Sequence, residues 1–174
     1  MKISIVIAAL GILFAAQASA ADYGIQVHGV SHHFSKRNLP SGENWNEQNF
    51  GVAFVRYADD ISYQIGAYKN SLSTSQASFY ARYAIVNYTL FERRGEHTYK
   101  LGAFAGVVDG YPLIKHWRDS SVRSVQKTGV APALGLFARV DLQDTNITAR
   151  LTPKRTSSRA QGSAVVSVEG GISF

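Results

Sequence analysis

Hydrophobic and polar residues alternate along this chain in successive segments, each closed by a turn or a loop. In residues 61–70, for example, Ile61 and Ile65 lie on an apolar face, whereas Ser62 and Gln64 lie on a polar one. Period-two alternation is the pattern of a β-strand that separates two environments. Eight segments have it: 23–34, 49–57, 61–70, 78–91, 99–109, 130–142, 146–152 and 163–174. No segment carries a convincing amphipathic-helix pattern, so we predict an all-β protein.

The connections between these segments alternate in length. Those after the second, fourth and sixth segments are short, and those after the first, third, fifth and seventh are longer and polar. Short turns on one side, long loops on the other and an aromatic C-terminal residue (Phe174) are typical of outer-membrane barrels. We therefore predict an eight-stranded antiparallel transmembrane β-barrel of the outer membrane, with a turn end in the periplasm and a loop end outside.

Charged residues distinguish this prediction from a soluble periplasmic sandwich, which would also show alternation. Lys100, Arg139, Arg150 and Glu169 lie on the face opposite the apolar one in the later segments. In a barrel these side chains point into a packed interior, where they neutralise one another, while the apolar face meets lipid.

The interior of an eight-stranded barrel is just wide enough for side chains or one slender ligand, which argues against a porin. Gly66, Gly102, Gly106 and Gly135 are expected to face this interior. They either leave a slot for a ligand or let the strands coil tightly, and both interpretations stay open at this point.

The N-terminal residues have the form of an export signal. Lys2 precedes an apolar run over residues 3–16, and Ala18-Ser19-Ala20 has the small-x-small form of a signal peptidase site. The run is too short for a membrane anchor. We expect residues 1–20 to be a signal peptide and residues 21–174 to form one barrel domain.

Composition narrows the chemistry and the partners. The chain has no cysteine, so it forms no disulfide and no thiolate site, and its formal net charge is +6. An exported basic protein seldom meets nucleic acid, so phosphate-rich lipid is the more natural partner. The expected loops carry Lys36, Arg37, Lys69, Lys115, His116, Arg118, Arg123, Lys127, Lys154, Arg155 and Arg159. These residues suit the phosphates of lipopolysaccharide, although some will form an ordinary solvated surface.

Residues with possible catalytic chemistry gather at the loop end. The first and third segments both end there, which brings Ser31-His32-His33 near Asn70-Ser71. A hydroxyl and an imidazole at one rim are the ingredients of base-assisted acyl transfer. Serine and histidine are also ordinary rim residues, so position alone does not establish catalysis.

Two prolines lie near the loop ends of neighbouring segments. Pro132 is in the sixth segment and Pro153 follows the seventh. Because proline cannot donate to a sheet ladder, strand pairing loosens where it occurs. We expect either a lateral opening for an acyl chain between these strands or simply the ends of two strands.

These residues resemble the lipid A palmitoyltransferase family. The resemblance rests on His33, Asn46-Glu47, Phe50-Gly51, the run Ala67-Tyr68-Lys69-Asn70-Ser71, the Pro132-bearing segment and Leu151-Thr152-Pro153. It implies an outer-membrane barrel that moves a palmitoyl-type chain from a phospholipid to lipid A, with an acyl slot in its interior.

The resemblance also implies roles for particular residues. Ser71 matches the family serine, and His33 or its neighbour His32 matches the histidine. Strand parity favours an inward His32, whereas the Ser-x-His-Phe spacing favours His33. We lead with His33 and keep His32 open, since a rim bulge can turn either residue inward. Asn70 stands where the family has an aspartate, and the family's N-terminal helix is missing. We take Gly66, Tyr68, Lys69, Pro132 and Pro153 as candidate substrate-binding residues.

The sequence thus predicts an outer-membrane lipid A acyltransferase with His33 as base and Asn70 orienting it. Ser71 would either act at the acyl carbonyl or hold the other residues in place by hydrogen bonds. A non-enzymatic lipopolysaccharide-binding barrel and a lipid A deacylase or esterase are the alternatives. We expect no cofactor and no metal. We also expect a monomer, because a closed barrel has no strand edge that demands a partner.

Overall fold

The computed structural model describes residues 22–34, 45–71, 80–110, 112–118, 121–127, 130–153, 156–157, 160–161 and 164–174. For 112–118, 121–127, 156–157 and 160–161 the description covers the backbone alone. The expected signal peptide at residues 1–20 lies outside the described residues. No helix among the described residues is long and apolar enough to cross a membrane.

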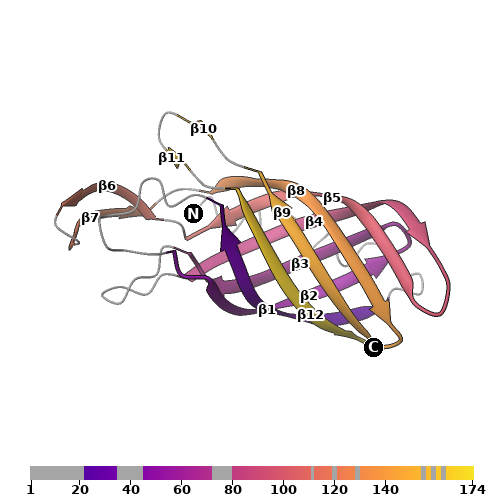
Figure 1. The fold of residues 1–174 in the computed structure, drawn as a ribbon. Coiled ribbons are helices and arrows are strands. Elements are labelled where there is room, and N and C mark those ends of the chain that lie inside the picture. Colours follow the sequence, from indigo (N-terminus) through magenta and orange to yellow (C-terminus); the bar gives the residue numbers. More distant parts are fainter. Residues whose placement is uncertain are drawn as a thin grey trace.

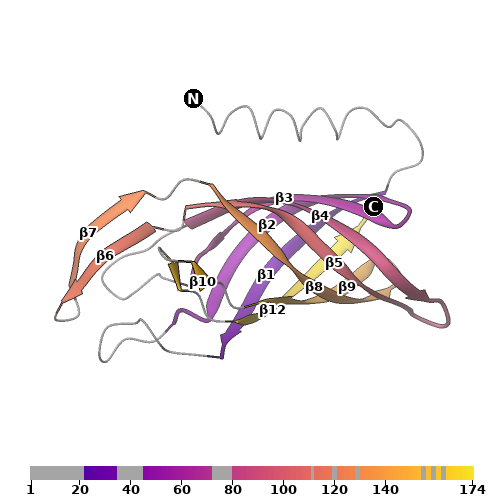
Figure 2. The ribbon, with the colours of Figure 1, turned by 90° about the horizontal axis from the view of Figure 1, so that it is seen from above.

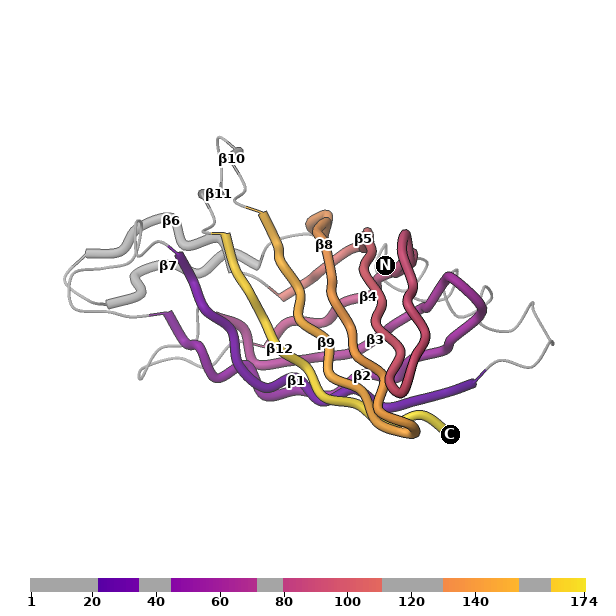
Figure 3. Tube along the Cα trace, turned by 45° about the vertical axis from the view of Figure 1, so that its right-hand side comes forward, coloured from indigo at the N-terminus to yellow at the C-terminus, as the bar shows by residue number. Residues whose placement is uncertain are grey.

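Eight antiparallel strands form a closed barrel (Figure 1), in the order β1-β12-β9-β8-β5-β4-β3-β2. The strands are β1 (Tyr23–His33), β2 (Gln48–Ala58), β3 (Ile61–Lys69), β4 (Tyr80–Arg93), β5 (Thr98–Asp109), β8 (Ala131–Leu142), β9 (Thr145–Thr152) and β12 (Val165–Ser173). The first and last strands close the barrel from the pair Gly24↔Ser173 to the pair His33↔Val165, and they run side by side in Figure 3. The predicted eight-stranded barrel is confirmed.

Two short hairpins stand where the sequence predicted only loops. Strands β6 (Pro112–Arg118) and β7 (Ser121–Lys127) form one two-stranded sheet, and β10 (Thr156–Ser157) and β11 (Ala160–Gln161) form another. The prediction missed β6 and β7 because charged residues interrupt the alternation there, and it missed β10 and β11 because two residues are too few to show a pattern.

Tight turns join the strands at the turn end of the barrel. Asp59 and Gln143 have φ values of 48° and 57°, which allow two-residue connections after β2 and β8. The start of β1 and the end of β12 meet at the same end, because Tyr23 and Phe174 exchange backbone hydrogen bonds of 3.0 and 2.8 Å. The strands tilt across the barrel in Figure 2, as closure of a small barrel requires.

The outer surface of the barrel is apolar and carries aromatic side chains near both ends. Exposed aliphatic residues such as Val52, Leu134, Leu136 and Ile147 cover the middle. The aromatic residues are Tyr23, Tyr88, Phe91, Tyr99 and Phe174 near the turn end, and Phe34, Phe50 and Tyr80 near the loop end. An apolar band between two aromatic girdles is the outer surface of a membrane-spanning barrel.

A bulge in β1 decides which histidine points inward. The register of β1 with both neighbours shifts between His28 and Val30. Beyond the bulge, His33 is 8 % exposed, whereas the His32 side chain is 64 % exposed on the outer side. Strand parity alone was therefore wrong for His32, and the preference for His33 as the inward histidine is confirmed.

The interior glycines hold neighbouring groups close and leave no slot. A Cβ on Gly102 would lie 2.6 Å from the ring of Phe137, and one on Gly135 would lie 2.6 Å from the ring of Phe104. A Cβ on Gly66 would lie 2.5 Å from that of Ala53. The second interpretation of the glycines is thus the one that the structure supports.

Candidate functional site

The segment Trp45-Asn46-Glu47 joins the loop ends of β1 and β3, and we name it the rim clasp. The backbone carbonyl of Glu47 accepts a hydrogen bond from the Ser31 amide at 2.8 Å. On the other side, the Asn46 amide donates to the Ser71 carbonyl at 3.0 Å, and its side chain donates to the Asn70 carbonyl at 3.2 Å. The sequence prediction that the ends of these two strands share one rim is therefore confirmed.

His33 packs against the clasp. Its ring stacks on Trp45 with centroids 4.6 Å apart, and its backbone amide donates to Glu47 Oε1 at 3.2 Å. The imidazole Nδ1 is buried and makes no hydrogen bond to a described residue. His32 reaches the same carboxylate from outside, with Nδ1 3.2 Å from Glu47 Oε1.

Asn70 and Ser71 are buried at the same rim, at 0 % and 7 % exposure. The Asn70 side chain donates to the Gly110 carbonyl at 3.0 Å, and so ties β3 to the end of β5. Among the described residues, no hydrogen bond joins His33 to Ser71. The structure brings the predicted histidine, asparagine and serine to one rim, but it does not show a hydrogen-bonded catalytic arrangement of them.

Asn49, which the sequence analysis missed, completes this polar rim. It is buried, accepts a hydrogen bond from the Ser31 hydroxyl and donates to the Lys69 carbonyl at 2.9 Å. The available signal was its position, since Asn49 begins the inward face of the second segment at the same rim as Ser31. Lys69 thus contributes its carbonyl to the rim.

The middle of the barrel is filled by a buried ion pair and the amides around it. Arg150 Nε donates to Glu169 Oε1 at 2.9 Å. The terminal nitrogens of the guanidinium donate to Asn87 Oδ1 at 2.6 Å and to Gln64 Oε1 at 2.7 Å. The guanidinium also lies 5.3 Å from the ring centre of Phe104. Arg150 and Glu169, which were predicted to lie in the interior and neutralise other charges there, thus neutralise each other.

An aromatic layer lies between this ion pair and the loop end. The rings of His28, Tyr68 and Tyr83 have centroids between 5.1 and 5.7 Å apart. His28 Nδ1 lies 3.3 Å from Glu169 Oε1, and Gln64 donates to the Tyr83 hydroxyl at 2.6 Å. Tyr68, a candidate substrate-binding residue, therefore belongs to the packed core.

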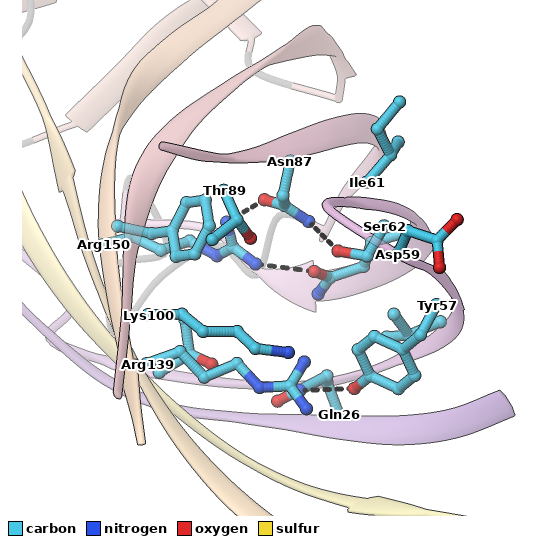
Figure 4. A pocket seen from close by; sticks show the side chains of 14 residues that line it. Gln26, Tyr57, Asp59, Ile61, Ser62, Asn87, Thr89, Lys100, Arg139 and Arg150 are labelled. Atoms are coloured by element: carbon cyan, nitrogen blue, oxygen red, sulfur yellow. Dashed lines mark hydrogen bonds between the residues drawn. The ribbon is translucent and has the colours of Figure 1, made fainter. Parts of the chain in front are cut away.

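A polar cavity opens toward the turn end below the ion pair (Figure 4). It contains about 450 Å³ of atom-free space, including the part open to solvent, and it ends at Arg150 and Gln64. Lys100 and Arg139 line one side, and Tyr57 and Ser62 are also among its lining residues. A long acyl chain would find charged and polar walls here rather than an apolar slot.

One seam of the barrel is incomplete near the loop end. Strand β8 pairs with β5 from Ala131 onward, but it pairs with β9 only from Leu136, which lies opposite Leu151. Pro132 lies in the stretch of β8 without a β9 partner, and Pro153 directly follows β9. The predicted loosening of strand pairing near these two prolines is confirmed.

No group of three or more His, Asp or Glu side chains in the described ranges is arranged to hold a metal ion.

Comparisons with known proteins identify the fold. No protein-family model and no curated protein sequence matches the chain. The crystal structure of neisserial surface protein A is similar, with 13 % identity, a TM-score of 0.50, and coverage of 88 % of this chain and 95 % of that one.

Two solution structures are also similar. Outer membrane protein H from P. aeruginosa, in DHPC micelles, has 15 % identity, a TM-score of 0.49 and coverage of 90 % and 100 %. Outer membrane protein W from E. coli has 12 % identity, a TM-score of 0.45 and coverage of 91 % and 100 %.

These likenesses concern the fold alone, and none of them supports the resemblance to lipid A palmitoyltransferases. Together with the apolar outer band and its aromatic girdles, the shared architecture makes this chain a small β-barrel of the Gram-negative outer membrane.

Proposed function

We propose that this barrel binds the phosphate groups of lipopolysaccharide through its loop end and acts as a non-enzymatic lipid-binding protein. The observation that carries the proposal is the separation of charge along the barrel axis. The sequence segments between strands at the loop end (35–44, 72–79, 111–129 and 154–163) contain nine Lys and Arg against two acidic residues. At the turn end, the connections and Asp22 contain five acidic residues against Arg94.

The filled interior supports a binding role for the loop end. Arg150, Glu169, Phe104 and Phe137 occupy the middle of the barrel, so a lipid chain has no apolar space there. Anionic lipid at the loop end would instead meet basic residues on the outside, each worth about 1 kcal/mol near such a surface.

The test is binding of the refolded protein to lipopolysaccharide and to its dephosphorylated form. We expect the double variant Lys154→Gln/Arg155→Gln to bind phosphorylated lipid more weakly, by about fivefold per charge removed. Arg94→Gln at the turn end is the control, and its binding should equal that of the wild type. If the wild type bound dephosphorylated lipopolysaccharide as tightly as the phosphorylated form, the proposal would be contradicted.

Lipid A acyl transfer is the second candidate, favoured by the incomplete β8–β9 seam. The donor phospholipid would lie against this seam rather than inside the barrel, with Pro132 and Pro153 beside it. His33 would act as base, Ser71 at the acyl carbonyl and Asn70 as orienting group, although the Asn70 side chain donates to Gly110 in this structure. These side chains would have to rearrange around the substrate.

Mass spectrometry of lipid A from cells with and without the protein distinguishes the candidates. Acyl transfer adds one long chain to lipid A, and the gain should vanish in Ser71→Ala and His33→Ala. A loss of acyl mass would indicate a deacylase instead. An unchanged spectrum, with folded protein in the outer membrane, would exclude both enzymes and leave the binding barrel.

A further inference from the structure

Two side-chain pairs face the turn-end cavity, which plays no part in the proposed loop-end function. Lys100 of β5 lies directly opposite Arg139 of β8 in the strand ladder. Tyr57 of β2 lies directly opposite Ser62 of β3. All four residues line the cavity, and Figure 4 shows Lys100 and Arg139 pointing toward the side that carries Tyr57 and Ser62.

The cation pair shares its neighbouring carboxylates with Arg94, so three cations face the two carboxylates of Glu92 and Asp141. Lys100 Nζ lies 3.6 Å from Glu92 Oε2 and 3.4 Å from Asp141 Oδ2, both longer than the 2.7–2.9 Å or so of a strong charge-assisted hydrogen bond. Arg139 donates its Nε to the same Asp141. Like charges directly opposite each other on adjacent strands are destabilising, so this pair favours a further negative group nearby.

Arg139 presents its donors to the cavity. Its guanidinium lies 4.3 Å from the ring centre of Tyr57, which holds its plane in place. Its two terminal nitrogens make no hydrogen bond to a described residue, because Nε alone is used for Asp141. A planar fork of this kind matches the oxygens of a phosphate group.

Both hydroxyls across the cavity are fixed as acceptors by amides. Asn87 Nδ2 donates to Ser62 Oγ at 2.9 Å, and Gln26 Nε2 donates to the Tyr57 hydroxyl at 3.2 Å. Each hydroxyl therefore keeps its own hydrogen for another acceptor. Asp59 is the acidic residue that lines the cavity, and it stands in the turn after β2.

We propose that the turn-end cavity is a binding site for a phosphate-class oxyanion, held by Lys100 and Arg139 and by the hydroxyls of Tyr57 and Ser62. The anion would bridge the cation pair and accept the two uncommitted hydroxyl hydrogens. Since this end of the barrel faces the periplasm in the expected orientation, the ligand is either free phosphate or the phosphate of a small phosphomonoester.

The test is an NMR titration of the refolded protein in detergent micelles at constant ionic strength. Inorganic phosphate and glycerol 3-phosphate are added in separate arms, with chloride as the reference anion. We expect saturable shifts at the Arg139 Nε–H and the Ser62 amide. Saturation by inorganic phosphate alone identifies a free-ion site, and saturation by both identifies a site that accepts phosphomonoesters.

Variants separate binding at this site from effects on folding. Lys100→Met should weaken binding at least tenfold, and Tyr57→Phe, which keeps the ring beneath Arg139, should weaken it severalfold. Arg82→Gln, which removes an exposed cation paired with Asp109, is the control and should leave the affinity unchanged. The proposal is overturned if neither anion gives saturable shifts, or if Lys100→Met and Tyr57→Phe both bind as the wild type does.

Discussion

Arg150 and Glu169 form an ion pair in the centre of the barrel, with Nε 2.9 Å from Oε1 and side chains that are 8 % and 2 % exposed. Every nitrogen of the guanidinium has a partner, because Asn87 and Gln64 accept from the two terminal ones. His28 and Gln64 approach the carboxylate from other strands. This network connects β1, β3, β4, β9 and β12 across the interior, and the stability of the barrel should depend on it.

Removing one member of this ion pair should lower the stability of the barrel. Glu169→Gln leaves the Arg150 charge buried without its counterion, and we expect a loss of about 3–5 kcal/mol in the free energy of unfolding. Urea unfolding of the protein in lipid vesicles measures it. The double variant Arg150→Met/Glu169→Leu leaves no buried charge behind, so it should lose less than Glu169→Gln. A larger loss in the double variant would show that the pair itself carries the stability.

Glycine positions inside the barrel should not tolerate even a methyl group. Gly102→Ala places a Cβ 2.2 Å from the Tyr88 carbonyl oxygen and 2.6 Å from the Phe137 ring. We expect this variant to lose about 1–3 kcal/mol of stability through overpacking. Gly170→Ala is the matched control, because no atom lies within 4 Å of its added Cβ. The midpoints of urea unfolding of the two variants measure the difference, and equal midpoints would contradict this packing.

The loop-end rim should loosen when Asn49 is truncated. Asn49→Ala leaves the Ser31 hydroxyl and the Lys69 carbonyl without their partner, at a cost of about 1–3 kcal/mol. We expect faster proteolysis of the loop end, together with a decrease of this size in the free energy of global unfolding. Gln48→Ala, which removes an exposed side chain, is the control. Unchanged proteolysis of Asn49→Ala would mean that the clasp does not depend on this amide.

Hydrogen exchange should reveal the incomplete seam. Residues 131–135 of β8 have no ladder pair with a described residue of β9, so we expect those of their amides that point away from β5 to exchange at least about ten times faster than amides of residues 136–142. NMR in deuterated buffer measures the exchange rates of both groups of amides in one experiment. Uniform protection along β8 would show that the seam is closed in solution.

The fold was predictable because each segment separates lipid from a polar interior. Alternation in residues 99–109, with Tyr99 and Leu101 on one face and Lys100 and Gly102 on the other, matches the exposed and inward sides of β5. Short turns such as Asp59-Asp60 then indicated which ends of the strands meet.

The site was only partly predictable, because its contacts depend on local irregularities and on distant segments. A bulge near Gly29 reverses the parity of β1, and no pattern in the sequence locates it. Trp45 reaches His33 from a segment that carries no alternation. The acyl slot expected from the family resemblance is absent from the described interior, since the glycines that suggested it lie against Phe104 and Phe137.

The reciprocal pairs Gly102↔Phe137 and Phe104↔Gly135 also constrain how the barrel assembles. The segment between β5 and β8 is too long for a tight turn to set their alignment, unlike the connections at the turn end. If β8 shifted by two residues relative to β5, Phe104 would lie opposite Phe137 and Gly106 would lie opposite Gly135. The interior would then be overpacked at the two rings and underpacked at the two glycines. The side chains themselves thus favour the correct register during folding, at a junction where no tight turn sets it.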